Sequence, residues 1–387
     1  MSSYVFPIKA AVLTFPLLAL LITAPFLIYY YRKYGQLGKL RSLILYSFVF
    51  YLLCIYYLVI LPLPSIDVVA QMTGPRYELH LFQSWHNFLN QTVLQVNNPS
   101  TYLPAMKQSV FLEPVFNIAL LFPLGVYSRY YFKLSLPKTI LISLGVSLFF
   151  ELTQLSGLYF IYPRPYRLFD VNDLLHNTIG GTLGFLCAPL FTFFLPTRNE
   201  LDSESLAKGQ KVSLLRRFVA FMIDWFVIGL VTSLLSLVPN PLPNKLTVLL
   251  NYSFVPFALE VIIYFMIFMY CWNGQTLGKK IVRIKVVEKD RNHIRFVSLV
   301  KRYSAFYLLL NGLLQIFQYT MTHLSTDNHT VFIAYVTFGF ISLGILLLFL
   351  FNLLYALIRR KTRLFHDKAS QTYTISTLKK EVEHANF

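Results

Sequence analysis

The sequence has few charged residues for its length. Only 13% of its 387 residues are Asp, Glu, Lys or Arg, whereas 56% are hydrophobic and 17% are aromatic. A soluble domain carries roughly 25% charged residues, so this composition excludes an ordinary soluble globular protein. The balance is typical of a protein that crosses a membrane several times.

Acidic residues and cysteines are also scarce. Seventeen acidic residues stand against 34 Lys and Arg, which gives a formal net charge of +17. This excess lies between apolar runs and suits the anionic inner face of a membrane, so we do not expect nucleic acid as a partner. The three cysteines, Cys54, Cys187 and Cys271, lie within apolar runs, which argues against disulfides or a metal cluster.

The common catalytic motifs are missing. The sequence contains no G-x-S-x-G nucleophile elbow, no H-E-x-x-H metal-binding helix and no glycine-rich phosphate loop before Lys-Ser/Thr. We therefore expect a protein that is not an enzyme and needs no metal and no cofactor. One alternative stays open, in which Glu151 and Asp173 act as acid and base on a lipid headgroup.

Apolar runs of about twenty residues, by contrast, are abundant, and each is long enough to cross a bilayer core of about 30 Å. They predict an all-α integral membrane protein with about nine transmembrane helices. The predicted spans are Ala10–Tyr31, Leu43–Leu61, Val110–Tyr127, Thr139–Leu155, Leu174–Leu195, Phe218–Val238, Tyr252–Trp272, Tyr303–Gln318 and Val331–Ile358.

Lys and Arg are distributed unevenly between the segments that connect these spans. With the N-terminus outside, 28 of the 34 fall on the cytoplasmic side, and this bias predicts an N-out/C-in orientation. The six that lie outside are Lys9, Arg76, Lys107, Arg164, Arg167 and Lys245. The long outside loop from Pro64 to Ser109 contains Leu81, Trp85, Phe88 and Leu89 at helical spacing, which predicts an amphipathic helix that lies in the outer headgroup region or caps the bundle.

Polar residues recur near the predicted outer ends of the third, fourth and fifth spans. Asp170, Asp173 and Asn177 share one helix face where the chain enters the fifth span. A carboxylate near the bilayer centre costs about 2.5–3.5 kcal/mol on insertion scales, so such residues face the bundle interior and indicate a functional site. Their predicted depths place seven residues in one candidate ligand-binding pocket, with Glu151 paired to Arg167 or an amide: Asn117, Glu151, Gln154, Arg167, Asp170, Asp173 and Asn177.

Small residues follow this polar set along the fifth span. Gly180 and Gly184 form a small-xxx-small pair, with Gly181 beside it. Such a surface lets another helix approach closely, so we expect tight helix packing that holds the polar set rigid.

Three blocks of this region carry a family resemblance. The blocks Asn117–Gly125, Glu151–Gln154 and Arg167–Gly181 resemble, in order and spacing, the VanZ-like family of bacterial membrane proteins. The family is named for a protein that lowers susceptibility to the glycopeptide antibiotic teicoplanin. The resemblance implies a multi-pass protein of the plasma membrane in a Gram-positive bacterium, with a role in antibiotic resistance. Its outer pocket would bind a cell-wall precursor, a lipid, or a glycopeptide or lipopeptide drug.

A second charged cluster occupies the C-terminal half. Arg217 opens the sixth span, Asp224 follows seven residues later on the same face, and Glu260 lies in the seventh span. Together with Gly274–Lys280 and with Asp367, which follows His366, they resemble the RDD family. The resemblance implies an ion or solute transporter, such as a cation/proton exchanger, in which Asp224 and Glu260 bind the cation and Arg217 gates it.

Two alternatives to transport follow from the same residues. Buried ions need partners, so Arg217, Asp224 and Asp367 could form a structural network that fixes the helix ends. If the outer cluster is structural as well, the protein is a membrane scaffold.

These patterns divide the chain into five parts. Residues 1–42 form an extra N-terminal transmembrane helix, 43–195 a VanZ-like domain, 196–211 a polar cytoplasmic linker, 212–376 an RDD domain and 377–387 a C-terminal tail. Apolar and basic residues partly alternate from Ile281 to Glu288, before a polar stretch at 290–293. This alternation predicts a small cytoplasmic hairpin at 281–296.

Overall fold

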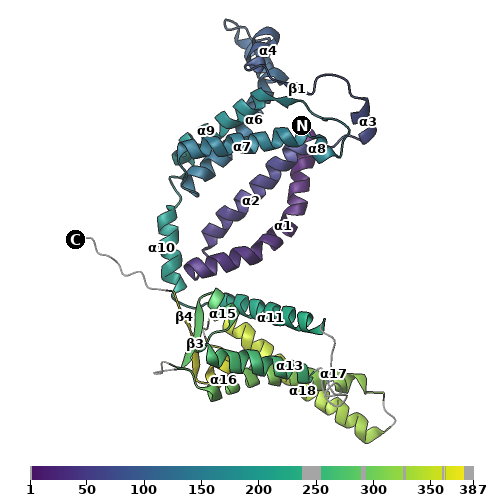
Figure 1. Cartoon of the computed structure of the whole chain (residues 1–387), viewed down its shortest axis with the longest axis vertical. Coiled ribbons are helices and arrows are strands. Elements are labelled where there is room, and N and C mark those ends of the chain that lie inside the picture. The colour runs from purple at the N-terminus through teal and green to yellow at the C-terminus, as the bar shows by residue number, and fades with distance from the viewer. Residues whose placement is uncertain are drawn as a thin grey trace, which may run out of the picture. The chain divides into compact units, whose positions relative to one another are not determined.

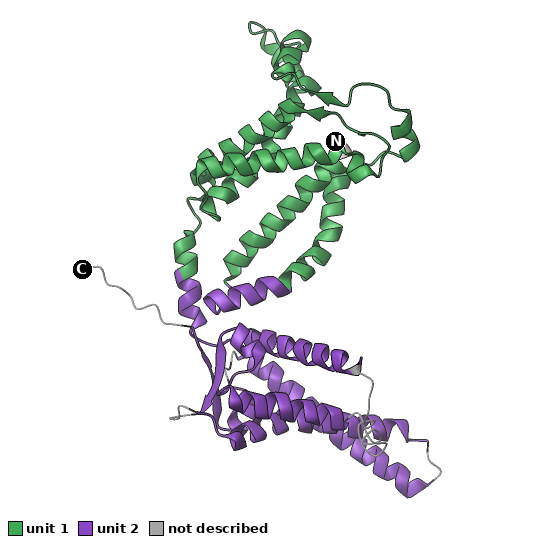
Figure 2. Cartoon of the chain, viewed as in Figure 1, with its two compact units in different colours: residues 1–23, 38–202 green, residues 24–37, 203–387 purple. Residues whose placement is uncertain are grey.

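A computed structural model of the chain describes residues 2–237, 254–288, 293–325, 328–359, 361 and 363–378. Lys245, the end of the sixth predicted span at Val238 and the start of the seventh at Tyr252 lie outside these ranges, as do residues 290–292 and, in the tail, 379–387. The described part is helical except for two short sheets of two strands each, which confirms the all-α prediction. Two compact units divide the chain: residues 1–23 and 38–202 form unit 1, and residues 24–37 and 203–387 form unit 2 (Figure 2).

Eight helices in the described ranges are long and apolar enough to cross a membrane, which identifies a multi-pass membrane protein in contact with the lipid bilayer. Each corresponds to one of the predicted spans (Figure 1). They are α1 (Ser2–Tyr34), α2 (Lys39–Ile60), α6 (Ser109–Tyr130), α7 (Leu136–Leu155), α9 (Val171–Thr192), α11 (Leu214–Ser236), the continuous run of α13 (Phe254–Glu260), η2 (Val261–Phe268) and α14 (Met269–Cys271), and α18 (His329–Ile358).

The predicted span from Tyr303 to Gln318 is the one that differs. This region forms α16 (Phe296–Tyr303), the π-helical η3 (Ser304–Leu308) and α17 (Leu309–Thr322), which packs along α18. The run from Phe296 to Thr322 is continuous, but it carries Lys301, Arg302 and a polar stripe of Asn311, Gln315 and Gln318, so it is less apolar than the eight candidate spans. By length and composition the described helices therefore include eight candidate spans, and the ninth span, like the N-out/C-in orientation, stays a prediction.

The closest helix contact in unit 1 joins α6 to α9. A Cβ atom at Gly180 would collide with the backbone of Ile118, and one at Gly184 would collide with the backbone of Phe122. The absence of side chains therefore lets two backbones touch, which confirms the close packing expected of the small-xxx-small pair. Helix α7 packs on another side of α9, and Ile55 of α2 packs with Leu121, Leu124 and Phe150 in the adjoining core.

The long loop of unit 1 folds into short elements. It contains α3 (Ile66–Gln71), β1 (Tyr77–Glu78), α4 (Gln83–Gln91), η1 (Pro99–Thr101) and α5 (Tyr102–Met106), and β1 pairs in parallel with β2 (Phe169–Asp170). The short α8 (Gly157–Phe160) follows α7. Helix α4 is the predicted amphipathic helix: Phe88 contacts Phe111 of α6, whereas Trp85 and Leu89 are exposed. It therefore has both a face that contacts the bundle and an exposed apolar face.

The predicted polar linker contains a helix, α10 (Arg198–Gly209). Thr197 and Glu200 form a reciprocal pair at its start: the Glu200 amide donates to the Thr197 hydroxyl at 3.3 Å, and the Thr197 amide donates to the Glu200 carboxylate at 2.9 Å. Such a capping box satisfies amides that otherwise lack partners in the first turn, which explains why a segment of polar composition is helical here.

A strand forms within the predicted hairpin, but the hairpin itself is wrong. Strand β3 (Ile284–Glu288) follows α15 (Leu277–Ile281) and pairs antiparallel with β4 (Thr372–Ser376), which follows α19 (Phe365–Ala369). Between residue 293, where the described chain resumes, and α16 there is no second strand. The amide and guanidinium of Arg295 bond the Glu288 carboxylate, and the amphipathic sequence from Phe296 continues as α16.

A buried arginine links several of these elements in unit 2. The guanidinium of Arg216, which has no exposed surface, donates to the carbonyl oxygens of Gly209, Val282 and Arg283 at 2.8 Å each. It also lies 3.3 Å from the hydroxyl of Ser376 in β4. One side chain therefore joins the end of α10 to both strands of the sheet.

Candidate functional site

Unit 1 contains a cavity of about 730 Å³ between the first half of α6, the end of α7 and the start of α9. Residues of α1, α2 and α4 complete its lining. The structure brings all seven residues of the candidate pocket to this cavity, which we call the outer cavity: Asn117, Glu151, Gln154, Arg167, Asp170, Asp173 and Asn177.

Glu151 points into the bundle and is 4% exposed. Its carboxylate accepts a hydrogen bond of 3.0 Å from the backbone amide of Asp170, whose own side chain caps α9 by accepting from the Asn172 amide at 2.8 Å. Of the two predicted partners of Glu151, Arg167 or an amide, the hydrogen bonds show an amide, and it belongs to the backbone of Asp170. Arg167 is exposed and lies 3.5 Å from the carbonyl oxygen of Leu61, although its charge acts on the Glu151 carboxylate.

Hydrogen bonds from three amide side chains fix the helices around the cavity. Asn117 of α6 donates to Asp173 of α9 at 2.5 Å, and Asn177 of α9 donates to the Ser147 hydroxyl of α7 at 2.9 Å. Gln154 of α7 donates to the carbonyl oxygen of Val59 in α2 at 3.1 Å. Because these bonds join four different helices, the polar lining is held in place before any ligand enters.

Two contributors to this site were not predicted. Glu113 lines the cavity one helical turn before Asn117, and Ser147 supports Asn177 from one turn before Glu151. The spacing of four residues from a known member of the site was the available signal for both. With Glu113 included, four carboxylates face the cavity beside the single guanidinium of Arg167. The outer cavity therefore presents mainly hydrogen-bond acceptors and negative charge.

The charged residues of unit 2 form two separate networks. In the first, Arg217 and Arg302 both bond the fully buried carboxylate of Asp367, at 2.8 and 2.5 Å. Burial opposes ionisation of Asp367, but the two guanidinium groups outweigh it and hold its pKa well below the usual range. Asp367 also accepts from the Leu364 amide at 2.7 Å and so begins α19.

Asp224 belongs to the second network and does not bond Arg217. Its carboxylate accepts hydrogen bonds from the Tyr264 hydroxyl at 2.8 Å, the Thr276 hydroxyl at 2.6 Å and the Gly278 amide at 2.7 Å. The ammonium of Lys279 lies 3.5 Å away. Four donors thus surround the Asp224 side chain, which has no exposed surface. The sequence had offered one structural network of Arg217, Asp224 and Asp367 as an alternative. In the structure these residues belong to two networks instead.

Glu260 is not brought together with Asp224. Its carboxylate accepts a hydrogen bond of 3.1 Å from Thr232, which lies eight residues beyond Asp224 on α11. At 1.5 Å per residue the two positions are about 12 Å apart along the helix. The predicted cluster lacked three residues of these networks, Arg302, Lys279 and Tyr264. In the sequence the basic residues predict only which side of the membrane a connecting segment faces.

Comparison with protein families assigns both halves of the chain. Residues 48–192 match the model of the VanZ/LLP1 family, and residues 211–371 match the model of the RDD family. No curated protein and no solved structure matches the chain.

Proposed function

The chain is a membrane protein that joins a VanZ-like domain to an RDD family domain, and we propose that its outer cavity binds the sugar or peptide part of a cell-wall precursor or of a glycopeptide. Through this binding it lowers susceptibility to glycopeptide antibiotics such as teicoplanin, in the cell envelope of a Gram-positive bacterium. The observation that carries the proposal is the convergence of seven polar residues from three spanning helices and one loop on one cavity.

The charge of the cavity favours this class of ligand. Glu113, Glu151, Asp170 and Asp173 supply carboxylate acceptors, and Arg167 is the only Lys or Arg in the described lining. Hydroxyl and ammonium groups complement such a surface, whereas a phosphate group is repelled by it. Sugars and peptides provide these donors, so the carbohydrate or peptide portion fits better than the phosphates of a lipid-linked precursor.

Binding rather than catalysis is the role we propose. One oxygen of Glu151 is held by the Asp170 amide, and one oxygen of Asp173 is held by Asn117. Carboxylates fixed by such donors are suited to recognising a ligand in one orientation.

A resistance assay tests this role. In a strain that lacks the gene, complementation with the E151Q variant is expected to restore normal membrane abundance but not glycopeptide resistance, because the change preserves size and removes one carboxyl oxygen from the cavity. The matched control is E204Q, which alters an exposed glutamate of α10 that is not in the cavity lining. Equal resistance in strains carrying E151Q and wild-type protein would contradict the proposal.

Direct binding provides a second measurement. Purified full-length protein in detergent is titrated with teicoplanin, and the E151Q variant is expected to bind at least about tenfold more weakly, as loss of one charge-assisted hydrogen bond implies. Unchanged affinity in E151Q would mean that the drug binds elsewhere.

A further inference from the structure

Unit 2 contains a cavity of its own, of about 510 Å³, which the proposed function does not use. We call it the basic cavity. Residues of α11, α16, η3 and α18 form most of its wall, and α15, α19 and the β3–β4 sheet contribute the rest. Its apolar wall includes Leu215, Phe218, Phe221, Phe306, Leu353 and Leu357.

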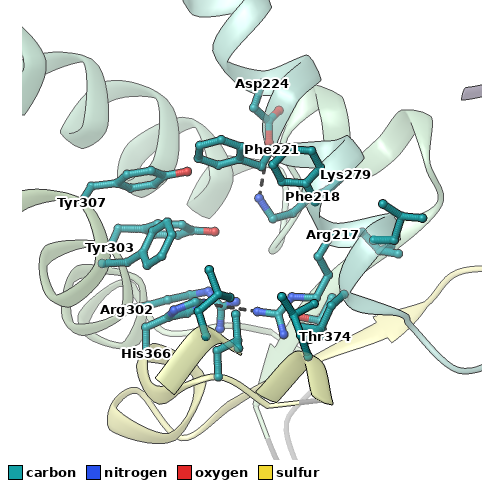
Figure 3. Close-up of a pocket in the computed structure, with 17 residues that line it drawn as sticks. Arg217, Phe218, Phe221, Asp224, Lys279, Arg302, Tyr303, Tyr307, His366 and Thr374 are labelled. Atoms are coloured by element: carbon teal, nitrogen blue, oxygen red, sulfur yellow. Dashed lines mark hydrogen bonds and ion pairs between the residues drawn. The ribbon is translucent and has the colours of Figure 1, made fainter. Parts of the chain in front are cut away.

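The charged residues of the basic cavity form two groups. Arg217, Arg302 and His366 lie together at one end of the basic cavity, and Lys279 lies beside Asp224 at the other (Figure 3). Both arginines share the single carboxylate of Asp367, and Lys279 has that of Asp224. Three cations therefore stand against two carboxylates.

His366 adds no compensating charge. Burial and the nearby charge of Arg302 hold its pKa well below 6.5, so the ring is neutral and its Nε2 accepts from Arg217 at 3.2 Å. The Nδ1 of His366 and the Nε of Arg302 have no hydrogen-bond partner in the described part of the chain, although both side chains are more than nine-tenths buried. Buried polar atoms usually have a hydrogen-bond partner in native proteins, so these two nitrogen atoms leave hydrogen bonds unmade.

The apolar wall lies on membrane-spanning helices. Phe218 of α11 is 55% exposed and Leu357 of α18 is 49% exposed, and both line the basic cavity. Exposed apolar side chains on spanning helices contact acyl chains, so the cavity is accessible from the lipid. The π-helical η3 contributes Phe306 and Tyr307, and π-helical turns are frequent at functional sites.

From this combination we propose that the basic cavity binds one acidic phospholipid, with its phosphate at Arg217 and Arg302 and one acyl chain along Phe218, Phe306 and Leu357. Guanidinium groups match phosphate oxygens in geometry and charge. Basic pockets between transmembrane helices on the cytoplasmic side recognise acidic headgroups in this way. The predicted N-out/C-in orientation places this end of unit 2 in the inner leaflet. A free anion would leave the apolar wall unused.

Lipid retention tests the proposal. Full-length protein is purified in detergent, stripped of lipid, mixed with phosphatidylglycerol or phosphatidylcholine, and examined by native mass spectrometry. We expect one retained phosphatidylglycerol and a preference over phosphatidylcholine of about tenfold, because both lipids carry the phosphate but the choline cation of phosphatidylcholine is repelled by the cations of the cavity. Equal retention of both lipids, or displacement of phosphatidylglycerol by excess inorganic phosphate, would overturn the proposal.

Two tryptophan variants locate the bound lipid. The L357W variant fills the apolar wall without altering the ion pairs and is expected to reduce retention of phosphatidylglycerol about tenfold. The L348W variant is the matched control, because Leu348 lies on the same helix, is 69% exposed and does not line the cavity. Equal retention by the two variants would show that the lipid binds elsewhere.

A charge variant then identifies the headgroup contact. Replacing Arg302 with Gln is expected to abolish the preference for phosphatidylglycerol over phosphatidylcholine. An unchanged preference in a folded R302Q protein counts against the proposal. If this variant does not fold, the tryptophan pair still decides the outcome, since neither tryptophan variant disturbs Asp367.

Discussion

The amide nitrogen of Asn117 lies 2.5 Å from a carboxylate oxygen of Asp173, and this hydrogen bond joins α6 to α9 at the edge of the outer cavity. The same two helices meet below it through the backbones of Phe122 and Gly184. The polar lining of the cavity and the tightest packing of unit 1 are therefore properties of one helix pair.

Replacing Asn117 with Ala is expected to lower the free energy of unfolding by about 1–3 kcal/mol, because the half-buried carboxyl group of Asp173 then loses this donor. Thermal unfolding of the purified protein in detergent measures the effect. In the N117A/D173N double variant the carboxylate is also removed, so its stability should exceed that of N117A. If N117A unfolds at the same temperature as the wild-type protein, this bond does not stabilise the helix pair.

The glycine contact provides a second prediction. A G184A variant is expected to lose about 1–3 kcal/mol of stability, since the added methyl group meets the Phe122 carbonyl and the helices must separate. Gly145 on α7 is the control, because an added Cβ meets nothing within 4 Å there. G145A should keep or raise the stability, by up to about 1 kcal/mol from helix propensity. Equal effects of the two changes would argue against close backbone packing.

Stability should depend on pH through His366. Burial holds its folded-state pKa well below 6.5, whereas the unfolded chain takes up the proton near 6.5. The contribution of the neutral His366 ring to the free energy of unfolding is therefore complete above pH 6.5. It is lost as the pH falls below 6.5, by about 1.4 kcal/mol per pH unit.

The H366Q variant isolates this effect, since glutamine can still accept from Arg217 but does not titrate. Thermal unfolding followed between about pH 7.5 and about pH 5, which bracket the ordinary histidine pKa, should give a steeper decline for the wild-type protein than for H366Q. Parallel curves would mean that the folded protein does not lower the pKa of His366.

Neutralising Asp224 should lower the stability of the protein far more than neutralising Glu260. D224N is expected to lower the free energy of unfolding by about 3–5 kcal/mol, because Lys279 then keeps a buried charge without its carboxylate. E260Q, with a partly exposed side chain and a threonine as partner, should change it by about 0.5 kcal/mol or less. Cation flux into proteoliposomes provides the contrasting readout. A stable D224N protein that has lost a flux present in the wild type would favour the transport hypothesis.

The outer cavity was predictable because its residues obey helical spacing in three spans whose depths the sequence already fixes. Asn117, Glu151 and Asp173 lie at matching depths, and apolar length alone sets those depths. The basic cavity was not predictable in the same way. Arg302 belongs to a basic segment, which predicts only the side of the membrane on which the segment lies. Nothing in that segment marks Asp367, which follows several helices later, as the partner of Arg302.

Two elements of secondary structure were also misjudged, for different reasons. The strand Ile284–Glu288 had a recognisable alternation, but its partner at Thr372–Ser376 is distant in sequence, and a hairpin is the default reading of a strand followed by a polar turn. Helix α10 had a signal that was overlooked. Thr197 and Glu200 stand at capping-box spacing, and the polar composition of the segment concealed it.

The pairing of β3 with β4 sets an order of events during synthesis. The ribosome makes β3 first, then α16, η3, α17 and α18, and only afterwards β4. Throughout that interval β3 has an open edge facing the cytoplasm, if the predicted orientation holds, and Arg216 lacks the hydroxyl of Ser376. An unpaired edge invites pairing with other chains. A chain that stops before Thr372 would thus leave this edge of β3 open to pairing with other chains, whereas β4 covers the edge in the finished protein.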